Sequence, residues 1–560
     1  MSRSALSNFQ IARLLHRYAT VMEIAGENPF RVRAIRNGAE SIEHLPDQVA
    51  SMANIDSDLK GVAGIGSGIL LLLHEILDTG RIANIDALAD RAPAGLTDIV
   101  ELPGIGAKTA AKLFQSAQVT DIETLRMALA TGKIAQTAGL GPKLGEKLAA
   151  GLAVLDRRSG RYRIGNVLPL ARRLVASLQA GLPALEQIEI AGSLRRWLET
   201  IGDINLLSTA DPARLAKLLE RESGVHDVSI DETAVHARHE QGLAIRIFHA
   251  SLASFGTELV RATGPGEHLG AINFDSDIEA ATEEAYYAHL GLPWIAPEFR
   301  QGANELELVR SGGAEGVIEL TDIIGEFHCH TVWSDGHATI REMAEAAREA
   351  GYSYLGISDH SHSLGVANGL TAERLHAQAA GIVQVSAELG FPLLRSSEIE
   401  VLRDGTLDFD AATLDELDVV IVSTHSGLTQ PRNELMARVE RALSGGHVDI
   451  LAHPSGRLIE EREAGDFDWP RMHELARDNH VALEINADPA RLDLNAEHAR
   501  QAIAAGCILT INCDSHSTDG FQKLEYGIGI ARRAFVPKDR VINTWPLERL
   551  RVWLADPGSR

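Results

Sequence analysis

The sequence predicts a multidomain protein in which a helical N-terminal region and a mixed α+β region precede a C-terminal α/β barrel. The chain has 560 residues, which is too long for a single hydrophobic core. Its hydrophobic pattern changes twice, near residue 160 and again near residue 321. After the second change, short apolar runs alternate with amphipathic helical segments, a rhythm typical of parallel strands covered by helices.

Composition restricts the classes of protein to which the chain can belong. Its 45% hydrophobic and 23% charged residues are ordinary for a globular protein. Cys329, Cys507 and Cys513 have no paired spacing, which argues against a disulfide framework and for a reducing compartment. No signal peptide is recognisable, and the longest apolar run, Ile69 to Leu73, is too short to span a bilayer. We therefore expect a cytoplasmic protein without a membrane partner.

The net charge of −24 counts against a general nucleic-acid binder, because contact with phosphates favours basic surfaces. Local contacts through backbone amides and a few basic side chains remain compatible with this charge.

Residues 1 to about 155 are predicted to be helical, because apolar residues recur at helical spacing between glycine-rich turns. Three of these turns, Val62–Gly68, Leu102–Lys108 and Ala138–Lys143, each precede a helical segment. Backbone N–H groups at such a helix N-terminus can bind a phosphate without reading the base. One turn of this kind is more often only a helix cap, but three in one region favour binding to the DNA backbone.

The turns resemble helix-hairpin-helix motifs, which implies contacts with DNA. Arg31, Arg33 and Arg36 lie close together on a predicted helix and are candidates for a terminal phosphate, with a solvated helix face as the alternative. The candidate contacts within the turns are Gly64, Gly66, Gly104, Gly106, Lys108, Gly139, Gly141 and Lys143.

The C-terminal region carries histidines and carboxylates where its predicted strands end. His328 and His330 are two residues apart, so on an extended strand both imidazoles face the same way. The same spacing relates Asp514 and His516. In α/β barrels the strand ends meet at one mouth, where functional residues lie. The candidate ligands and catalytic residues are His328, His330, Asp335, His360, Glu398, His425, His453, Asp514 and His516.

Imidazole and carboxylate groups without thiolates suit Mn²⁺ or Zn²⁺, with Fe²⁺ as a further candidate, and argue against a closed structural zinc site. Nine ligands are too many for one ion, so two to three divalent metal ions are expected. Clustered ions of this kind stabilise attacking and leaving oxygens in phosphoryl transfer. Scattered structural histidines, the alternative, would not fall at successive strand ends.

At these residues the chain resembles the PHP (polymerase and histidinol phosphatase) domain over about residues 322–560. The resemblance implies a distorted (β/α)7 barrel, three metal ions and an activity such as phosphatase, phosphodiesterase or 3′-5′ exonuclease. Arg457 and Arg491 match positions near the substrate and are candidates for phosphate binding. A surface ion pair would explain either arginine equally well.

The segment Ala191–Leu207 resembles the palm of family X DNA polymerases, a nucleotidyltransferase fold. Ser193 and Arg196 match the motif that contacts the nucleotide triphosphate in that family. The resemblance extends over residues 1–320 and gives the whole chain the layout of the bacterial family X enzymes. The domains that it implies are a helical DNA-binding (8-kDa-like) domain at 1–85, a helix-hairpin-helix fingers-like domain at 86–160, a palm at 161–260, a thumb-like domain and linker at 261–321, and the PHP domain at 322–560.

The palm departs from the family at its catalytic carboxylates. Asp203 is retained, but the second aspartate is Asn205 and the position of the third is Ala244. The two-metal mechanism of polymerases needs carboxylates to hold both ions. The lysine that forms a Schiff base in lyase-competent members corresponds to Leu72. We therefore expect the palm to have lost templated synthesis.

These observations predict a DNA-processing, metal-dependent phosphoesterase that acts in DNA repair. A 3′-5′ exonuclease is the first expectation and an endonuclease at abasic sites (AP endonuclease) the second. The polymerase half would bind gapped, nicked or primer–template DNA without synthesis.

Three other functions stay open. The first is an active family X polymerase and 3′-5′ exonuclease that fills gaps, and the second is a DNA-end binding module that recruits other repair proteins. The third is a small-molecule phosphatase on an N-terminal scaffold. Intact hairpins argue against the phosphatase, and the complete ligand set argues against a pure binding module.

Overall fold

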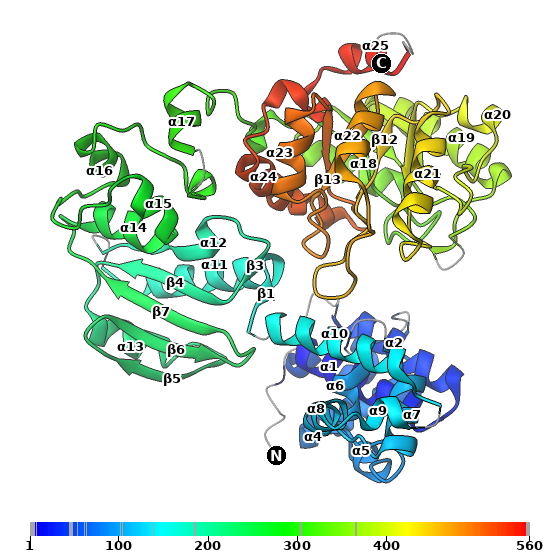
Figure 1. Cartoon of the computed structure of the whole chain (residues 1–560), viewed down its shortest axis with the longest axis horizontal. Coiled ribbons are helices and arrows are strands. Elements are labelled where there is room, and N and C mark those ends of the chain that lie inside the picture. Colours follow the sequence, from blue (N-terminus) through cyan, green and yellow to red (C-terminus); the bar gives the residue numbers. More distant parts are fainter. Residues whose placement is uncertain are drawn as a thin grey trace. The chain divides into compact units, whose positions relative to one another are not determined.

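The computed structural model of the chain is drawn in Figure 1. It describes residues 6, 8–43, 49–52, 54–60, 62, 64–100, 102, 105–137, 139–158, 160–183, 186–302, 305–364 and 367–555. Two compact units divide it, Met1–Ser159 and Gly160–Arg560. Among the helices described, none combines the length and the apolarity that a membrane span requires.

The regular elements described in the first unit are all helices, as the sequence predicts. Its helices bury two separate apolar clusters, one around Leu15 and Leu73 and the other around Leu113 and Leu125. The elements are α1 (Asn8–Ile24), α2 (Pro29–Glu43), η1 (Val49–Ser51), α3 (Ile55–Asp58), α4 (Ser67–Thr79), α5 (Ala83–Ala87), α6 (Leu96–Val100), α7 (Ala107–Ala117), α8 (Ile122–Ala130), α9 (Lys133–Gln136) and α10 (Pro142–Arg158).

The second unit opens with a mixed sheet of order β2-β4-β7-β6-β5, against which two helices, α11 and α13, pack. A separate two-stranded ribbon pairs β1 with β3 in antiparallel fashion. The bounds are β1 (Tyr162–Arg163), α11 (Ile164–Ala180), β2 (Ile188–Ile190), α12 (Gly192–Arg195), β3 (Thr200–Ile201), β4 (Asp203–Ser208), α13 (Pro212–Leu219), β5 (Val225–Ile230), β6 (Ala234–His239) and β7 (Ala244–His249).

A cluster of helices follows this sheet, and its core combines aliphatic and aromatic side chains. Tyr286, Tyr287 and Phe299 are buried within it. The elements are α14 (Phe255–Thr263), α15 (Gly266–Ala271), α16 (Glu283–His289), η2 (Pro297–Phe299), α17 (Glu305–Arg310) and η3 (Leu320–Asp322).

The rest of the second unit is the predicted barrel, with seven parallel strands in the order β14-β13-β12-β11-β10-β9-β8. Its two edges meet, because a parallel bridge joins Cys329 to Ser515 and His330 N donates to Ser515 O at 2.8 Å. Nearly every strand residue is buried, as expected for parallel strands with helices outside them (Figure 1). The strands are β8 (Gly325–Glu326), β9 (Tyr354–Ile357), β10 (Leu393–Glu400), β11 (Val419–Ser423), β12 (Ile450–Leu451), β13 (Ala482–Asn486) and β14 (Leu509–Asn512).

Helices alternate with these strands, which confirms the strand–helix rhythm predicted from the sequence. They are α18 (Ile340–Glu349), α19 (Ala372–Leu389), α20 (Ala411–Leu414), α21 (Arg432–Leu443), α22 (Trp469–Asp478), α23 (Ala496–Ala504), η5 (Thr518–Lys523), α24 (Leu524–Arg533), η6 (Lys538–Arg540), η7 (Ile542–Thr544) and α25 (Leu547–Ala555).

One buried carboxylate joins α12, which follows strand β2, to the cluster of helices after the sheet. Glu283 accepts from Arg195 at 2.7 and 3.0 Å and from Arg300 at 2.7 Å, and Arg300 is fully buried. Burial by itself would raise the pKa of Glu283, but the two guanidinium groups outweigh it and hold the pKa at about 2, below the ordinary 4.5. The stabilisation that follows from this lowered pKa is present above pH 4.5 and is lost as the pH falls toward 2.

Replacing Glu283 with Ala is expected to lower the free energy of unfolding by about 3–5 kcal/mol, because the buried Arg300 and the half-buried Arg195 lose their partner. Urea unfolding followed by fluorescence would measure it. The matched control is Glu284→Ala, at the exposed neighbouring position of α16, and should change stability little. Equal stability of the two variants would contradict the assigned role of Glu283.

Candidate metal centre

The structure brings all nine candidate ligands together at the carboxyl ends of the barrel strands. Each follows a strand directly or after a short turn, except Glu398, which lies within β10. Their donor atoms form four overlapping groups, and within each group these atoms lie within 4.8 Å of one another. The groups are His330, Asp335, His360 and His516; His328, Glu398 and His453; His328, His330 and Asp514; and His360, Glu398 and His425.

Glu398 lies at the middle of this cluster. Its carboxylate oxygens are between 2.8 and 3.6 Å from ring nitrogens of five histidines, while its side chain is only 1% exposed. The five are His328, His330, His360, His425 and His453. A carboxylate surrounded in this way bridges the four donor groups into one cluster.

Several buried donor atoms of the cluster have no hydrogen-bond partner in the described part of the chain. They are Nε2 of His328, both ring nitrogens of His330, Nδ1 of His360, Nδ1 of His453 and Oε2 of Glu398. An unsatisfied buried polar group costs about 1–3 kcal/mol. Because divalent cations would satisfy such atoms, and because the donors are imidazoles and carboxylates, the residues fit a cluster of divalent metal ions.

Carboxylates behind the cluster fix the orientation of its imidazoles. Glu484 accepts from His328 Nδ1 at 2.8 Å and from His453 N at 2.7 Å, and it is fully buried. Glu400 lies 3.0 Å from His425 Nδ1. In both histidines the bond at Nδ1 directs Nε2 toward Glu398.

Asp359 has a similar supporting role. It accepts from Thr331 N at 2.8 Å and Ser334 N at 3.1 Å, which holds the turn that carries Asp335. The sequence prediction missed Asp359, Glu400 and Glu484. The available signal was an acidic residue inside or directly after an apolar strand, since such residues stay buried only when they are paired.

The electrostatics of the cluster suit cation binding. Burial, together with the imidazoles of His516 and His360, lowers the pKa of His330 to about 3, so its ring is neutral as a metal ligand must be. Burial also disfavours protonation of His516, but the carboxylates of Asp335 and Asp514 outweigh it and raise its pKa to about 9. A divalent ion that binds between those carboxylates would displace this proton.

The backbone around the centre is strained. His453, Leu492 and Asp514 have positive φ angles of 29°, 44° and 50°, which non-glycine residues rarely adopt. Strain of this kind is concentrated at functional sites, where the surrounding contacts enforce it.

The two arginines predicted to bind phosphate have different surroundings. Arg491 Nε lies 3.5 Å from Asp514 Oδ2, and its Nη1 is buried without a hydrogen-bond partner in the described residues. Arg457 instead pairs with Glu199 at 2.9 and 3.0 Å. Only Arg491 therefore presents an unengaged donor beside the candidate metal centre.

In the segment predicted to be a polymerase palm, Asp203 is engaged by its neighbours. Asp203 lies opposite Ala244 in the parallel pair β4–β7, and Asn205 lies opposite Arg246. The Asn205 amide donates to Asp203 Oδ1 at 2.8 Å, and the Arg246 guanidinium forms an ion pair with Asp203 Oδ2. A positive guanidinium therefore lies against the one carboxylate of the predicted polymerase site that the sequence retains.

The residues of the nucleotide motif lie in and just after α12. Ser193 O accepts from Leu198 N at 3.2 Å, and the guanidinium of Arg196 donates to Thr263 O of α14. Burial and the nearby cation of Arg533 lower the pKa of Arg196 to about 10. This side chain is directed into the protein.

The glycine turns of the first unit precede α4, α7 and α10, as predicted. At Gly66, Gly106 and Gly141 no described atom lies within 4 Å of the place where a Cβ would stand, so these helix N-termini have open space beside them. At Gly64, φ is +79° and a Cβ would meet Asn37 O at 2.9 Å, so only glycine fits. Gly104 lies outside the described residues.

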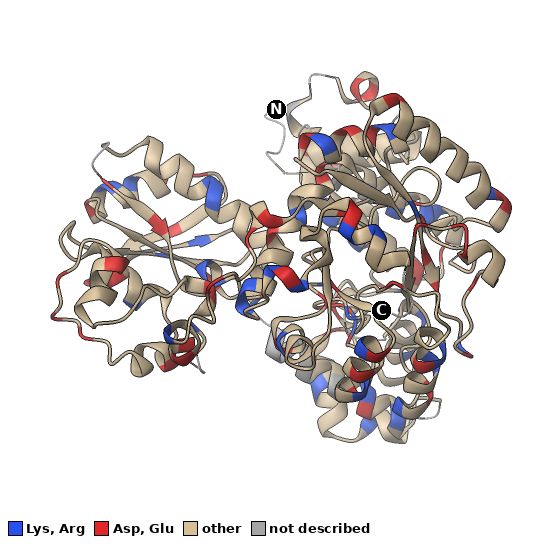
Figure 2. Ribbon diagram, turned by 90° about the horizontal axis from the view of Figure 1, so that it is seen from above, with Lys and Arg blue, Asp and Glu red and all other residues tan. Residues whose placement is uncertain are grey.

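The other candidate DNA contacts are basic. Arg31 and Arg33 are exposed on α2, whereas Arg36 pairs with Glu23 at 2.5 Å. Lys and Arg are interspersed with Asp and Glu over the described helices, in keeping with the negative net charge (Figure 2). Lys108 and Lys143 lie in the first turns of α7 and α10, beside Gly106, Gly139 and Gly141.

Two family models match separate parts of the chain. A helix-hairpin-helix domain matches residues 7–82, and a PHP domain matches residues 326–488. The chain is 37% identical over 570 residues to the DNA polymerase/3′-5′ exonuclease PolX of Bacillus subtilis (strain 168), covering 97% of this chain and 98% of that protein.

Shorter relatives are described as probable phosphatases. The chain is 27% identical to one from Shewanella loihica (strain ATCC BAA-1088 / PV-4), over 42% of this chain and 94% of that protein. It is 28% identical to another from Shewanella pealeana (strain ATCC 700345 / ANG-SQ1), over 41% of this chain and 92% of that protein.

Replacing Glu484 with Ala is expected to weaken Mn²⁺ binding by roughly 10- to 100-fold, because His328 loses the acceptor that orients it. Isothermal titration of the metal-free protein would measure this change. Glu474→Ala removes a carboxylate from an exposed ion pair with Arg471 on α22 and serves as the control. Unchanged affinity after Glu484→Ala would show that Glu484 does not orient a metal ligand.

Proposed function

The chain belongs to the family of the Bacillus subtilis DNA polymerase/3′-5′ exonuclease PolX, and from this membership we propose that its barrel is a metal-dependent 3′-5′ exonuclease acting in DNA repair. One observation carries the proposal. Nine imidazole and carboxylate groups converge at one mouth of the barrel, and several of their buried donor atoms have no hydrogen-bond partner in the described residues.

The four donor groups would hold two to three ions, with Mn²⁺ or Zn²⁺ favoured over Fe²⁺ by the mixture of imidazoles and carboxylates. Such ions, when bound, act as Lewis acids on phosphoryl oxygens and lower the pKa of water. Glu398 spans the groups and keeps them together. Glu484 and Glu400 keep the imidazoles oriented, so the centre needs little reorganisation when substrate arrives.

Arg491 is the side chain best placed to bind the scissile phosphate. It lies beside Asp514, and the N–H groups of its buried Nη1 have no hydrogen-bond acceptor in the described residues. A planar guanidinium can bind two phosphate oxygens at once and so orient the phosphorus for attack. Phosphate binding by Arg457 would require Glu199 to release it, so we assign the contact to Arg491 first.

The first unit would bind DNA through its hairpins. The open helix N-termini at Gly66, Gly106 and Gly141 can accept backbone phosphates, with Arg31 and Arg33 adding charge. Contacts of this kind are independent of sequence, which suits an enzyme that acts on gapped, nicked or primer–template DNA.

We further propose that the palm does not synthesise DNA. Only Asp203 remains of three carboxylates, and both of its oxygens are engaged by Asn205 and Arg246. Two divalent ions would have to displace a guanidinium and bind beside an amide and an alanine, which are poor ligands or none.

The second candidate is an active polymerase and exonuclease, and the name of the Bacillus subtilis relative favours it. It would require a carboxylate other than those expected at positions 205 and 244 to help Asp203 hold metal. An AP endonuclease would use the same barrel centre as the exonuclease. The two activities differ in the DNA that is bound there, an abasic site or a 3′ end.

Replacing both His328 and His330 with Ala is expected to abolish digestion of 5′-labelled gapped DNA while leaving DNA binding nearly unchanged. Gel assays of digestion and of mobility shift would measure the two properties. His376→Ala, which alters an exposed histidine paired with Glu416, is the control and should digest normally. Continued digestion by the double variant would place the nuclease outside the barrel.

A further inference from the structure

We propose that Glu199, a palm residue, is a positioning residue for the barrel nuclease, and that it acts through Arg457 to hold Arg491 at the candidate metal centre. This inference rests on the proposed nuclease function. It gives the palm a task in hydrolysis that does not depend on nucleotide incorporation.

The first link joins Glu199 to Arg457. The two Glu199 oxygens lie 2.9 and 3.0 Å from the two terminal nitrogens of Arg457. The side chains are only 28% and 15% exposed, so solvent screens this pair weakly. A bidentate pair of a guanidinium and a carboxylate fixes orientation as well as distance.

The second link joins Arg457 to the backbone around Arg491. Arg457 Nε donates to Arg491 O at 2.9 Å, and its Nη2 donates to Leu492 O. All three nitrogens of the guanidinium are therefore used, either on the palm carboxylate or on the loop that carries Arg491. Rotation of Arg457 would release both carbonyls of that loop.

The third feature is the strain of this loop, which makes its shape dependent on such contacts. Leu492 has a φ of +44°, an unfavourable value for a residue with a Cβ. Asp493 is buried and accepts from Ser455 N and Gly456 N, each at 3.0 Å, so the loop after β12 is joined to the loop after β13. Arg457 adds two further hydrogen bonds, to Arg491 O and Leu492 O.

The palm presents Glu199 on a well-supported element. Glu199 immediately precedes β3, and its carbonyl accepts from Ile164 N at 3.0 Å. Arg163, on the paired strand β1, forms an ion pair with Glu461 of the barrel at 2.5 Å. At Gly165 a Cβ would approach Pro489 Cβ to 2.4 Å, so α11 meets the same loop directly.

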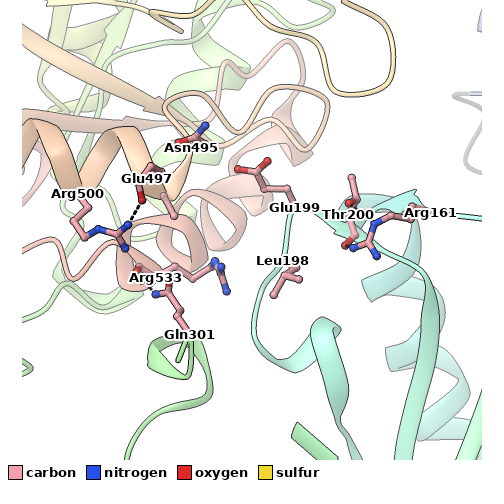
Figure 3. A pocket seen from close by; sticks show the side chains of 10 residues that line it. Arg161, Leu198, Glu199, Thr200, Gln301, Asn495, Glu497, Arg500 and Arg533 are labelled. Carbon is pink, nitrogen blue, oxygen red and sulfur yellow. Dashed lines mark hydrogen bonds and ion pairs between the residues drawn. The ribbon is translucent and has the colours of Figure 1, made fainter. Parts of the chain in front are cut away.

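Figure 3 shows the place where the palm faces the barrel. Glu199 extends from the palm segment between Leu198 and Thr200, at the edge of a cavity of about 420 Å³. Asn495 and Arg533 line the barrel side of this cavity. Because Asn495 follows the Arg491 loop closely in sequence, this cavity lies beside the loop, and the Glu199–Arg457 pair is one of the contacts between the palm and the loop.

The test compares Glu199→Ala and Glu199→Gln with the unchanged full-length protein, on gapped DNA and on bis(4-nitrophenyl) phosphate, both with Mn²⁺. Glu199→Ala should lower kcat roughly tenfold on both substrates, because each presents a phosphodiester to Arg491. Glu199→Gln, which keeps an acceptor oxygen, should retain part of the activity. Metal content and DNA affinity should stay unchanged.

The matched control is Arg172→Ala, which removes a bidentate ion pair with Glu525 at 2.8 Å between palm and barrel but does not touch Arg457. Its kcat should be normal. An equal loss in Arg172→Ala would mean that general docking of the palm matters and would overturn the inference.

A double variant tests whether Glu199 acts through Arg491. Adding Glu199→Ala to Arg491→Ala should cause no further loss, whereas multiplicative losses would contradict the proposed route. If the His328 and His330 double variant still digests DNA, the proposed function fails. If that variant is inactive while Glu199→Ala is fully active on both substrates, the positioning role alone fails.

Discussion

The burial of the Glu398 carboxylate among five histidines is the constraint around which the C-terminal part of the molecule is organised. A negative charge at 1% exposure, with imidazoles 2.8 to 3.6 Å away, is tolerated only where cations or protons balance it. The parallel barrel supplies those groups because its strands end at one mouth. Closure between Cys329 and Ser515 then brings the first and last ligand pairs, which are far apart in sequence, onto the same centre.

The proposed palm retains its packing where its proposed chemistry has been lost. Strand β4 is in parallel register with β7, and Asp203 and Asn205 lie opposite Ala244 and Arg246. The bidentate pairs Arg195–Glu283 and Arg457–Glu199 hold this region to its surroundings. This pattern is the one expected if the palm now serves to bind DNA and to shape the barrel mouth.

The sequence predicted the fold class, the strand–helix rhythm and the nine groups that the structure brings together, because local patterns encode all three. The spacing of His328 and His330 predicted that both imidazoles face the same way, and the apolar run before them predicted the strand end. Glu484 was missed because its importance follows from a contact with His328 that is 156 residues away. The engagement of Arg457 by Glu199 spans 258 residues and was likewise invisible. Local sequence patterns therefore identified the candidate metal ligands, whereas the residues that orient those ligands depend on tertiary contacts.

The central claim is that the barrel hydrolyses DNA while the palm no longer extends it. The most direct measurement is a gel assay of the full-length protein on 5′-labelled gapped DNA with Mn²⁺, with and without deoxynucleotides. A ladder of shortened products that nucleotides leave unchanged is the predicted result. Extended products would show that Asp203 still supports synthesis despite Asn205, Ala244 and Arg246, and would contradict the account.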